Sequence, residues 1–410
     1  MRTPRQRPAV LLLAAIALLV AGSSGPATAL SNSGVEFWAV DLDNVSNGSV
    51  FGIVVANAGS SAANVTVDKT SGGVASTTIA AGGLHTFTFP RAILNGSAQT
   101  AASTYRVAGD QPIVAYQFNP LGNVFSNDAS MLLPTEALGT EYYVVAREYW
   151  PAGLTRGFVT AVAAQDSTTV SITVNAPTIA GAGIGPLTAG STITRTLAKY
   201  QALQLESASG DLTGSRIVSD KPVSVFGGHE CTQLPIGAGA CDHLEEQMFP
   251  VSTLGRNFDF CRSKKRGTES DLMRVVATED ATTVTTDPAL PGTPATLNEG
   301  QHLNLTVAAD TQVDADKAVI TASYLVSQNA GAGIGDPSMI MTVPTEQFRG
   351  DYIFLTPNTF AQDWLTITAP TSATITLDGA TIPSSAFTPL GNSGQSCARV
   401  AVTDGAHRIT

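Results

Sequence analysis

The sequence predicts an all-β protein built from tandem β-sandwich-like repeats, and three observations support this. From Leu30 onward, short runs rich in β-branched residues, such as Phe51–Ala56 and Thr168–Val174, are separated by turn residues every 8 to 15 positions. Almost no stretch has a sustained 3.6-residue periodicity. Three sequence anchors recur in the same order at spacings of roughly 90 to 116 residues, which suits one β-sandwich per repeat.

The three anchors differ in kind. The first is a turn followed by a strand, at Gly109–Tyr116, Ser219–Phe226 and Ala315–Ala322. The second is a proline followed eight residues later by an aromatic residue, in the pairs Pro134 and Tyr142, Pro250 and Phe258, and Pro344 and Tyr352. The third is a Thr-rich strand, beginning at Asn64, Thr169, Thr283 and Thr374. We expect the three aromatic residues to occupy equivalent buried positions, and Pro222 to lie at an edge or a bulge of its strand.

The repeats are expected at residues 30–155, 156–265 and 266–410, with a cysteine loop in the second and the start of a truncated fourth at the end. Residues 1–29 read as a secretory signal. Three arginines precede the apolar run Ala9–Ala21, and Ala27–Ala29 has the small residues of a cleavage site. We therefore expect an exported protein, at the cell surface or extracellular.

Composition narrows the class of protein. Charged residues make up 13% of the chain, and the net charge of −11 includes no basic stripe, which argues against nucleic acid as a partner. After the leader, no apolar run is long enough to insert into a membrane. The four cysteines of an exported chain are expected to form disulfides.

Unusual chemistry is concentrated at residues 227–250, GGHECTQLPIGAGACDHLEEQMFP, which hold two of the four cysteines and two of the five histidines. We expect a disulfide between Cys231 and Cys241. The alternative is a tetrahedral zinc site formed by these two thiolates with His229 and His243, although the H-x-C spacing is not a standard one. Cys261 and Cys397 remain, and parity alone pairs them; the alternative is a free, buried thiol.

Sequence motifs for catalysis are missing. Neither G-x-S-x-G nor H-E-x-x-H occurs. His229 and His243 beside Asp242 could orient a nucleophile such as Ser252, but structural histidines that brace the cysteine loop are the simpler interpretation. The aspartates at 310, 314 and 316 lack the alternating pattern of a calcium loop and are expected in turns. We therefore predict a non-enzyme without a cofactor.

The same segment carries a resemblance to a known family. The pattern runs G-H-x-C at 228–231, a Pro/Gly loop, C-D-H-L-x-E-Q at 241–247, Pro250, and S-T-x-G at 252–255. It resembles the IgGFc-binding protein N-terminal domain family, over about residues 100 to 410. The resemblance implies adhesion or mucus-type recognition, with an antibody Fc as one ligand.

These features predict a secreted, non-enzymatic binding or adhesion protein that presents loops on a β scaffold. Its partner would be an extracellular protein or a glycan. Specialised loops on a rigid framework are common recognition sites, so the expected binding residues belong to the cysteine loop: His229, Glu230, Thr232, Gln233, Asp242, His243, Glu245 and Glu246. The alternatives are a structural module of a surface layer, which would associate with itself, and a hydrolase using the His/Asp/Glu cluster.

Overall fold

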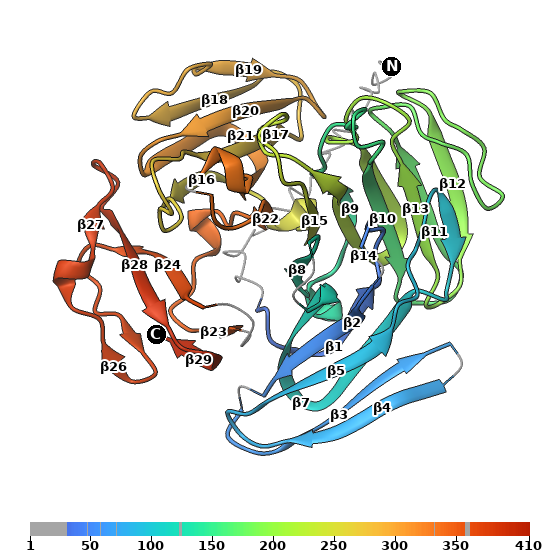
Figure 1. Ribbon diagram of the computed structural model, residues 1–410, viewed down its shortest axis with the longest axis horizontal. Helices are drawn as coiled ribbons and strands as arrows, with labels where there is room; N and C mark the ends of the chain where they lie inside the picture. Colours follow the sequence, from blue (N-terminus) through green and yellow to red (C-terminus); the bar gives the residue numbers. More distant parts are fainter. Residues whose placement is uncertain are drawn as a thin grey trace, which may run out of the picture.

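The computed structural model describes residues 31–46, 48–57, 59–70, 72–122, 125–331, 333–356 and 361–410, and the leader predicted at 1–29 lies outside them. The described residues form β-strands joined by short 3-10 turns, which confirms the all-β class (Figure 1). No helix among them is long and apolar enough to cross a membrane.

Seven strands recur three times with the same pairing, and each set forms one repeat. Repeat one contains β1 (Gly34–Val40), β2 (Val50–Ala56), β3 (Ala63–Lys69), β4 (Gly72–Ile79), β5 (Leu84–Pro90), β7 (Thr104–Leu121) and β8 (Asp128–Met131). Repeat two contains β9 (Gly139–Tyr143), β10 (Gly157–Ala163), β11 (Thr168–Thr173), β12 (Thr192–Leu197), β13 (Ala202–Glu206), β14 (Arg216–Thr232) and β15 (Asp242–Gln247). Repeat three contains β16 (Gly255–Phe260), β17 (Asp271–Ala277), β18 (Thr282–Asp287), β19 (Ala295–Leu297), β20 (His302–Val307), β21 (Thr311–Leu325) and β22 (Ser338–Met341).

One long strand organises each repeat. The first half of β7 pairs with β1 and β3, and its second half pairs with β2 and β8. The long strands β14 and β21 have the corresponding neighbours. A single strand therefore runs through both sheets of a curled sandwich. In β14 the crossing is an irregularity between Val218 and Val223, which confirms the bulge predicted from Pro222.

The first and third sequence anchors contact each other. The aspartate of each turn accepts a hydrogen bond from the backbone N–H at the start of a Thr-rich strand. The pairs are Asp110 with Asn64, Asp220 with Thr169, and Asp316 with Thr283, each at 2.8 Å. These carboxylates replace the ladder bond that the crossing interrupts, which explains why an aspartate recurs in every repeat.

Prolines close the repeats. Pro134, Pro250 and Pro344 precede the 3-10 turns η1 (Thr135–Ala137), η2 (Val251–Thr253) and η4 (Thr345–Gln347), with nearly identical backbone angles. Each proline packs on the glycine that opens the same repeat. A Cβ added to Gly34, Gly139 or Gly255 would lie 2.3, 2.5 or 2.4 Å from the proline Cβ. Only glycine fits these contacts, so the first strand and the closing turn specify each other.

The aromatic anchors occupy the predicted kind of position in two repeats. Tyr142 lies opposite Ile217 in β14, and Phe258 lies opposite Val313 in β21, each three residues before the turn aspartate. Both side chains are buried. Phe37 is their counterpart in repeat one. Tyr352 starts β23 (Tyr352–Thr356) and is partly buried. The aromatic residue thus lies in the first strand of each of the three repeats. These first strands begin at Gly34, Gly139 and Gly255, whereas the sequence boundaries were expected at 156 and 266.

Shared cores join neighbouring repeats. Strand β10 is buried along its whole length. Its residues Phe158 and Val162 pack in the core of repeat one, whereas Val159 and Ala161 pack in the core of repeat two. The alternation of side chains along one strand thus serves two cores. The short β6 (Ala98–Thr100) of the first repeat also adds to the sheet of the second by pairing with β13. The repeats consequently form one continuous structure.

The remaining residues form a smaller C-terminal unit. Its strands are β23, β24 (Asp363–Pro370), β25 (Thr376–Leu377), β26 (Ala380–Thr381), β27 (Thr388–Pro389), β28 (Gln395–Val402) and β29 (Gly405–Ile409), in two small sheets. Leu355 packs against Val54 and Ala56 of repeat one. The unit therefore lies between repeats three and one, and the four units surround the inner strands β8, β15 and β22 (Figure 1).

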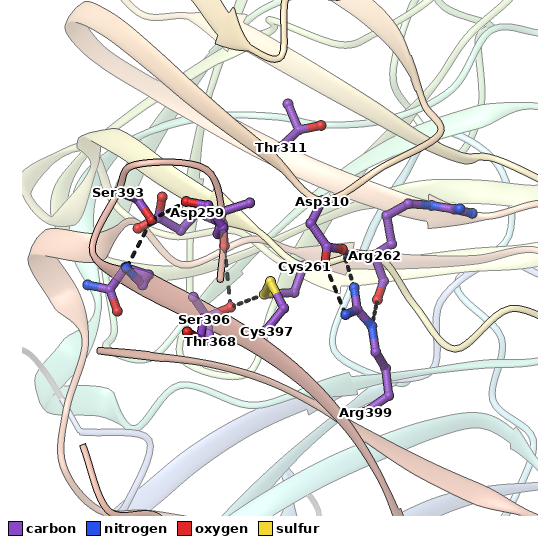
Figure 2. The surroundings of a disulfide bond; sticks show 12 residues. Asp259, Cys261, Arg262, Asp310, Thr311, Thr368, Ser393, Ser396, Cys397 and Arg399 are labelled. Carbon is purple, nitrogen blue, oxygen red and sulfur yellow. Dashed lines mark hydrogen bonds and ion pairs between the residues drawn. A yellow bond between two sulfur atoms is a disulfide. The ribbon is translucent and has the colours of Figure 1, made fainter. Parts of the chain in front are cut away.

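A disulfide attaches the C-terminal unit to repeat three. Cys261 follows β16 and is bonded to Cys397 of β28 (Figure 2). Beside it, Arg399 Nη1 donates to Asp310 Oδ2 at 3.0 Å, and Arg399 Nε donates to the carbonyl of Arg262 at 2.8 Å (Figure 2). Asp310, one of the aspartates considered for calcium, thus serves this interface.

Candidate functional site

The cysteine-rich segment is the hairpin that joins β14 to β15. Cys231 and Cys241 form a disulfide, with their Cα atoms 5.3 Å apart. The two sulfurs are bonded to each other, so the thiolates required by the alternative zinc site are not available. The loop rests on repeat three, because Leu234 N donates to Ser327 Oγ at 2.8 Å and Ser327 N donates to the Leu234 carbonyl at 2.7 Å. The tip, residues 235–237, is exposed.

The structure places most of the expected binding residues in the interior. Five of them have side chains that are at most 2% exposed: His229, Thr232, Asp242, His243 and Glu245. The other three, Glu230, Gln233 and Glu246, are partly buried. Such side chains contact other parts of the same chain. In this structure, the five most buried of these side chains are therefore not exposed at the surface.

His243 and Glu245 form a buried polar pair at the boundary with repeat one. His243 Nε2 lies 3.3 Å from Glu245 Oε2, to which Gln117 Nε2 donates, also at 3.3 Å. Burial raises the pKa of Glu245 well above its ordinary value. Burial, with the positive charge of Arg91, lowers the pKa of His243 to about 3. Both shifts favour the neutral forms, which are a protonated carboxyl and an uncharged imidazole.

A second polar cluster joins the three inner strands. Asp128 Oδ2 of β8 accepts hydrogen bonds from Glu245 N of β15 at 3.2 Å and from Met339 N of β22 at 3.3 Å. Ser130 Oγ donates to Glu246 Oε2 at 2.9 Å. Burial raises the pKa of Asp128 well above its ordinary value and that of Glu246 to about 8. The Glu-Glu-Gln run of repeat two thus fits the Asp-Ala-Ser run of repeat one.

His229 braces the other side of the hairpin. Its Nδ1 accepts a hydrogen bond from Cys231 N at 3.1 Å, which leaves Nε2 to donate to the carbonyl of Glu148 at 3.2 Å. Burial lowers the pKa of His229 to about 3, so the ring is neutral at physiological pH. The role fits the structural interpretation given to this histidine.

Arg274 anchors repeat three to repeat two and was not singled out in the sequence. Its side chain is 1% exposed, and Nη1 donates to Asp211 Oδ2 at 2.7 Å and to the carbonyl of Ala146 at 2.6 Å. A lone arginine in a strand has no motif around it. The one signal in the sequence is that Arg274 stands among the apolar residues of β17. An arginine at such a buried position requires charged or hydrogen-bonding partners.

Three acidic residues approach a metal-ligand arrangement. Carboxylate oxygens of Asp43, Glu206 and Glu230 lie within 4.8 Å of one another. Burial and the hydrogen bond to Asp43 raise the pKa of Glu206 to about 10, and burial raises that of Glu230 to about 7. Glu206 therefore keeps its proton at neutral pH, so the cluster carries less negative charge than three ionised carboxylates would.

The residues considered for hydrolysis do not assemble. His243 contacts Asn119 and Glu245, whereas Asp242 Oδ1 accepts the N–H of Asn127 at 2.5 Å. Ser252 lies in η2, beyond the far end of β15. Nucleophile, base and orienting carboxylate are thus separated, and a triad needs them in one hydrogen-bonded row.

Three equivalent connections adjoin at the end of the inner strands where the cysteine loop lies. Each follows a long strand and precedes an inner strand: residues 122–127 before β8, 233–241 before β15, and 326–337 before β22. We call their described residues the three-loop face. Asn127 bonds to Asp242, and Leu234 bonds to Ser327, so the connections adjoin. Each presents one large exposed apolar side chain: Phe125 is 68% exposed, Ile236 45% and Ile334 59%.

This architecture defines a class of protein: a β-repeat scaffold whose polar signature is mostly buried and whose three connecting loops adjoin one another. The family model described as IgGFc binding protein matches residues 128–410, and the chain belongs to that family. The chain is also similar to the human IgGFc-binding protein, with 34% identity over 131 residues. The matched segment covers 32% of this chain and 2% of the human protein, so the chain spans only a small part of that relative.

Proposed function

We propose that this chain is an exported, non-enzymatic binding protein that engages an extracellular protein through the three-loop face. The observation that carries the proposal is the exposure of Phe125, Ile236 and Ile334 on three adjoining loops. Exposing large apolar side chains to water is unfavourable, and burying them in a protein interface lowers the free energy. Family membership supports a binding role, and the name of the human relative makes an antibody Fc the first candidate partner.

The scaffold suits such a role. The Cys231–Cys241 disulfide fixes the base of the cysteine loop. The hydrogen bonds between Leu234 and Ser327 hold this loop to the equivalent loop of repeat three. A loop held at its base loses less conformational entropy on binding than a free one. Recognition can then vary at the tips while the buried polar residues keep the repeats together.

Purified chain, immobilised on a sensor surface, tests the proposal against human IgG Fc, a panel of extracellular proteins and a glycan array. Saturable binding of a protein that is lost on mutation of the three apolar tips supports it. Binding of glycans alone, or of no molecule on the panel, contradicts it.

Self-association is the second candidate, and one strand favours it. Strand β4 lies at the edge of the repeat-one sheet, and most of its residues are exposed. An exposed edge offers unpaired N–H and C=O groups to another strand. Sedimentation velocity over a hundredfold range of concentration separates the two candidates, because an assembly module would form concentration-dependent oligomers and a monomeric binder would not.

A further inference from the structure

A mainly apolar cavity of about 220 Å³ opens at the end of the inner strands opposite to the three-loop face. Repeat one contributes Met131, Leu133 and Ala137, and repeat two contributes Phe249, Pro250 and Thr253. The closing turn of repeat three and the first strand of the C-terminal unit complete the wall. The six residues of β15 separate this cavity from the loops by roughly 20 Å at the usual strand rise.

The wall is rigid. Pro250 and Pro344, two of the closing prolines, line the cavity and pack on Gly139 and Gly255. Leu133 is held by its N–H, which donates to Gln247 Oε1 at 2.8 Å. A cavity formed by fixed turns keeps its shape without a ligand, so binding requires little reorganisation.

Arg349 and Tyr352 bring hydrogen-bond donors to the wall of the cavity. Arg349 carries a positive charge, and its Nη1 donates to Ser31 Oγ at 2.9 Å, which leaves other N–H groups of the guanidinium for a ligand. The backbone N–H of Arg349 donates to the Tyr352 hydroxyl oxygen at 2.6 Å, so the hydroxyl proton is directed elsewhere. No carboxylate is among the described residues that line the cavity. The adjacent Asp351 is engaged by Arg408, at 2.9 and 2.7 Å.

We propose that this cavity binds a small monocarboxylic acid with a compact aromatic or branched apolar body. The apolar part would fill the space between the proline turns, and the carboxylate would accept hydrogen bonds from Arg349 and Tyr352. An arginine matches a carboxylate in charge and in its two-pronged geometry. The volume lies below the range of about 300–1,000 Å³ for drug-sized ligands, so the ligand is small. The site is independent of the function proposed for the three-loop face.

Isothermal titration calorimetry of the exported chain with 3-phenylpropionate tests this proposal. We expect saturable binding of the acid, and affinity for 3-phenyl-1-propanol at least about tenfold lower, since a hydrogen bond to a charged group contributes about 1.5–3 kcal/mol. Arg349→Gln should reduce the affinity for the acid about tenfold and leave that for the alcohol unchanged. Acetate, which lacks the apolar body, should bind more weakly than the acid.

Two variants fill the cavity from different walls, Thr253→Phe and Gln347→Trp, and both should abolish binding of acid and alcohol. Having both keeps the test valid if one of them fails to fold, as judged by its melting temperature. A variant of the three loop tips should bind the acid like the wild type. The proposal is overturned if the acid does not bind at millimolar concentration, if Arg349→Gln affects acid and alcohol equally, or if a folded filling variant still binds.

Discussion

The carboxyl group of Asp128 accepts the backbone N–H of Met339 at 3.3 Å, across 211 positions of sequence. The same oxygen accepts the N–H of Glu245 at 3.2 Å, so one side chain joins the inner strands of all three repeats. Burial raises the pKa of this carboxyl well above its ordinary value, which favours its neutral form. A neutral amide of the same shape should therefore replace it.

The first prediction follows directly. Asp128→Asn should change the free energy of unfolding by less than about 1 kcal/mol at pH 7, because the amide oxygen can still accept the hydrogen bonds from Glu245 N and Met339 N, and only the local bond from Ala129 N is lost. Asp128→Ala should lower it by about 2–3 kcal/mol, since it leaves the N–H groups of Ala129, Glu245 and Met339 without this acceptor. Differential scanning calorimetry of both variants measures the difference. Equal losses would show that Asp128 contributes as a charge.

The second prediction concerns pH. Glu246 has a folded pKa of about 8, raised by burial from an ordinary value of 4.5. Below pH 4.5 the carboxyl is protonated in both states, and its contribution to stability is fully present. Between pH 4.5 and 8 the unfolded chain releases this proton while the native carboxyl keeps it. Stability therefore falls as pH rises through this window, and above pH 8 the loss is complete.

Glu246→Gln removes this titration. The melting temperature of the variant relative to wild type should rise by at least about 2 °C between pH 4.5 and pH 8, because each pKa unit corresponds to about 1.4 kcal/mol. Glu141→Gln is the control, because that carboxylate lies on the exposed face of β9 beside Arg216. A Glu246→Gln variant with the same pH dependence as the wild type would contradict the raised pKa.

The third prediction separates the two disulfides. Cys261 and Cys397 are 136 positions apart, and Cys231 and Cys241 are 10 apart. In the chain-entropy model, these closures stabilise by about 5 and about 3 kcal/mol, so the double Cys→Ser variant of the long loop should melt at the lower temperature. Limited proteolysis should then release the C-terminal unit first in that variant. Earlier melting of the short-loop variant would contradict this order.

Local patterns in the sequence predicted the fold well. The turn aspartate, the closing proline and the aromatic anchor recur because each is required by a contact within one repeat, such as Asp220 with Thr169 or Pro250 with Gly139. The counterpart Phe37 was missed because no proline precedes it at the same distance. A sequence pattern does not tell whether an anchor ends one repeat or begins the next, so the boundaries expected at 156 and 266 stay predictions.

The site was harder to predict, for a physical reason. Glu245 and His243 were expected in an exposed binding loop. Their partners Gln117 and Asn119 lie more than 100 residues away in another repeat. Burial between repeats depends on how the sandwiches pack, and no short pattern encodes it. The same holds for the loops that carry Phe125 and Ile334, which adjoin the cysteine loop through the Asn127–Asp242 and Leu234–Ser327 hydrogen bonds.

The central claim is that recognition resides in the three apolar tips and not in the buried signature. The most direct measurement is surface plasmon resonance against human IgG Fc, or against the protein that the panel identifies if Fc does not bind. It compares the triple variant Phe125→Ser, Ile236→Ser, Ile334→Ser with two controls. They are Val74→Ser, which changes an exposed apolar residue of β4, and Glu246→Gln, which changes a partly buried residue of the signature.

We predict that the triple variant keeps the melting temperature of the wild type within about 2 °C and loses affinity at least about tenfold, as expected for removal of apolar anchors. Both controls should bind like the wild type. Unchanged affinity in the triple variant, or a comparable loss in Glu246→Gln at unchanged stability, would contradict the claim.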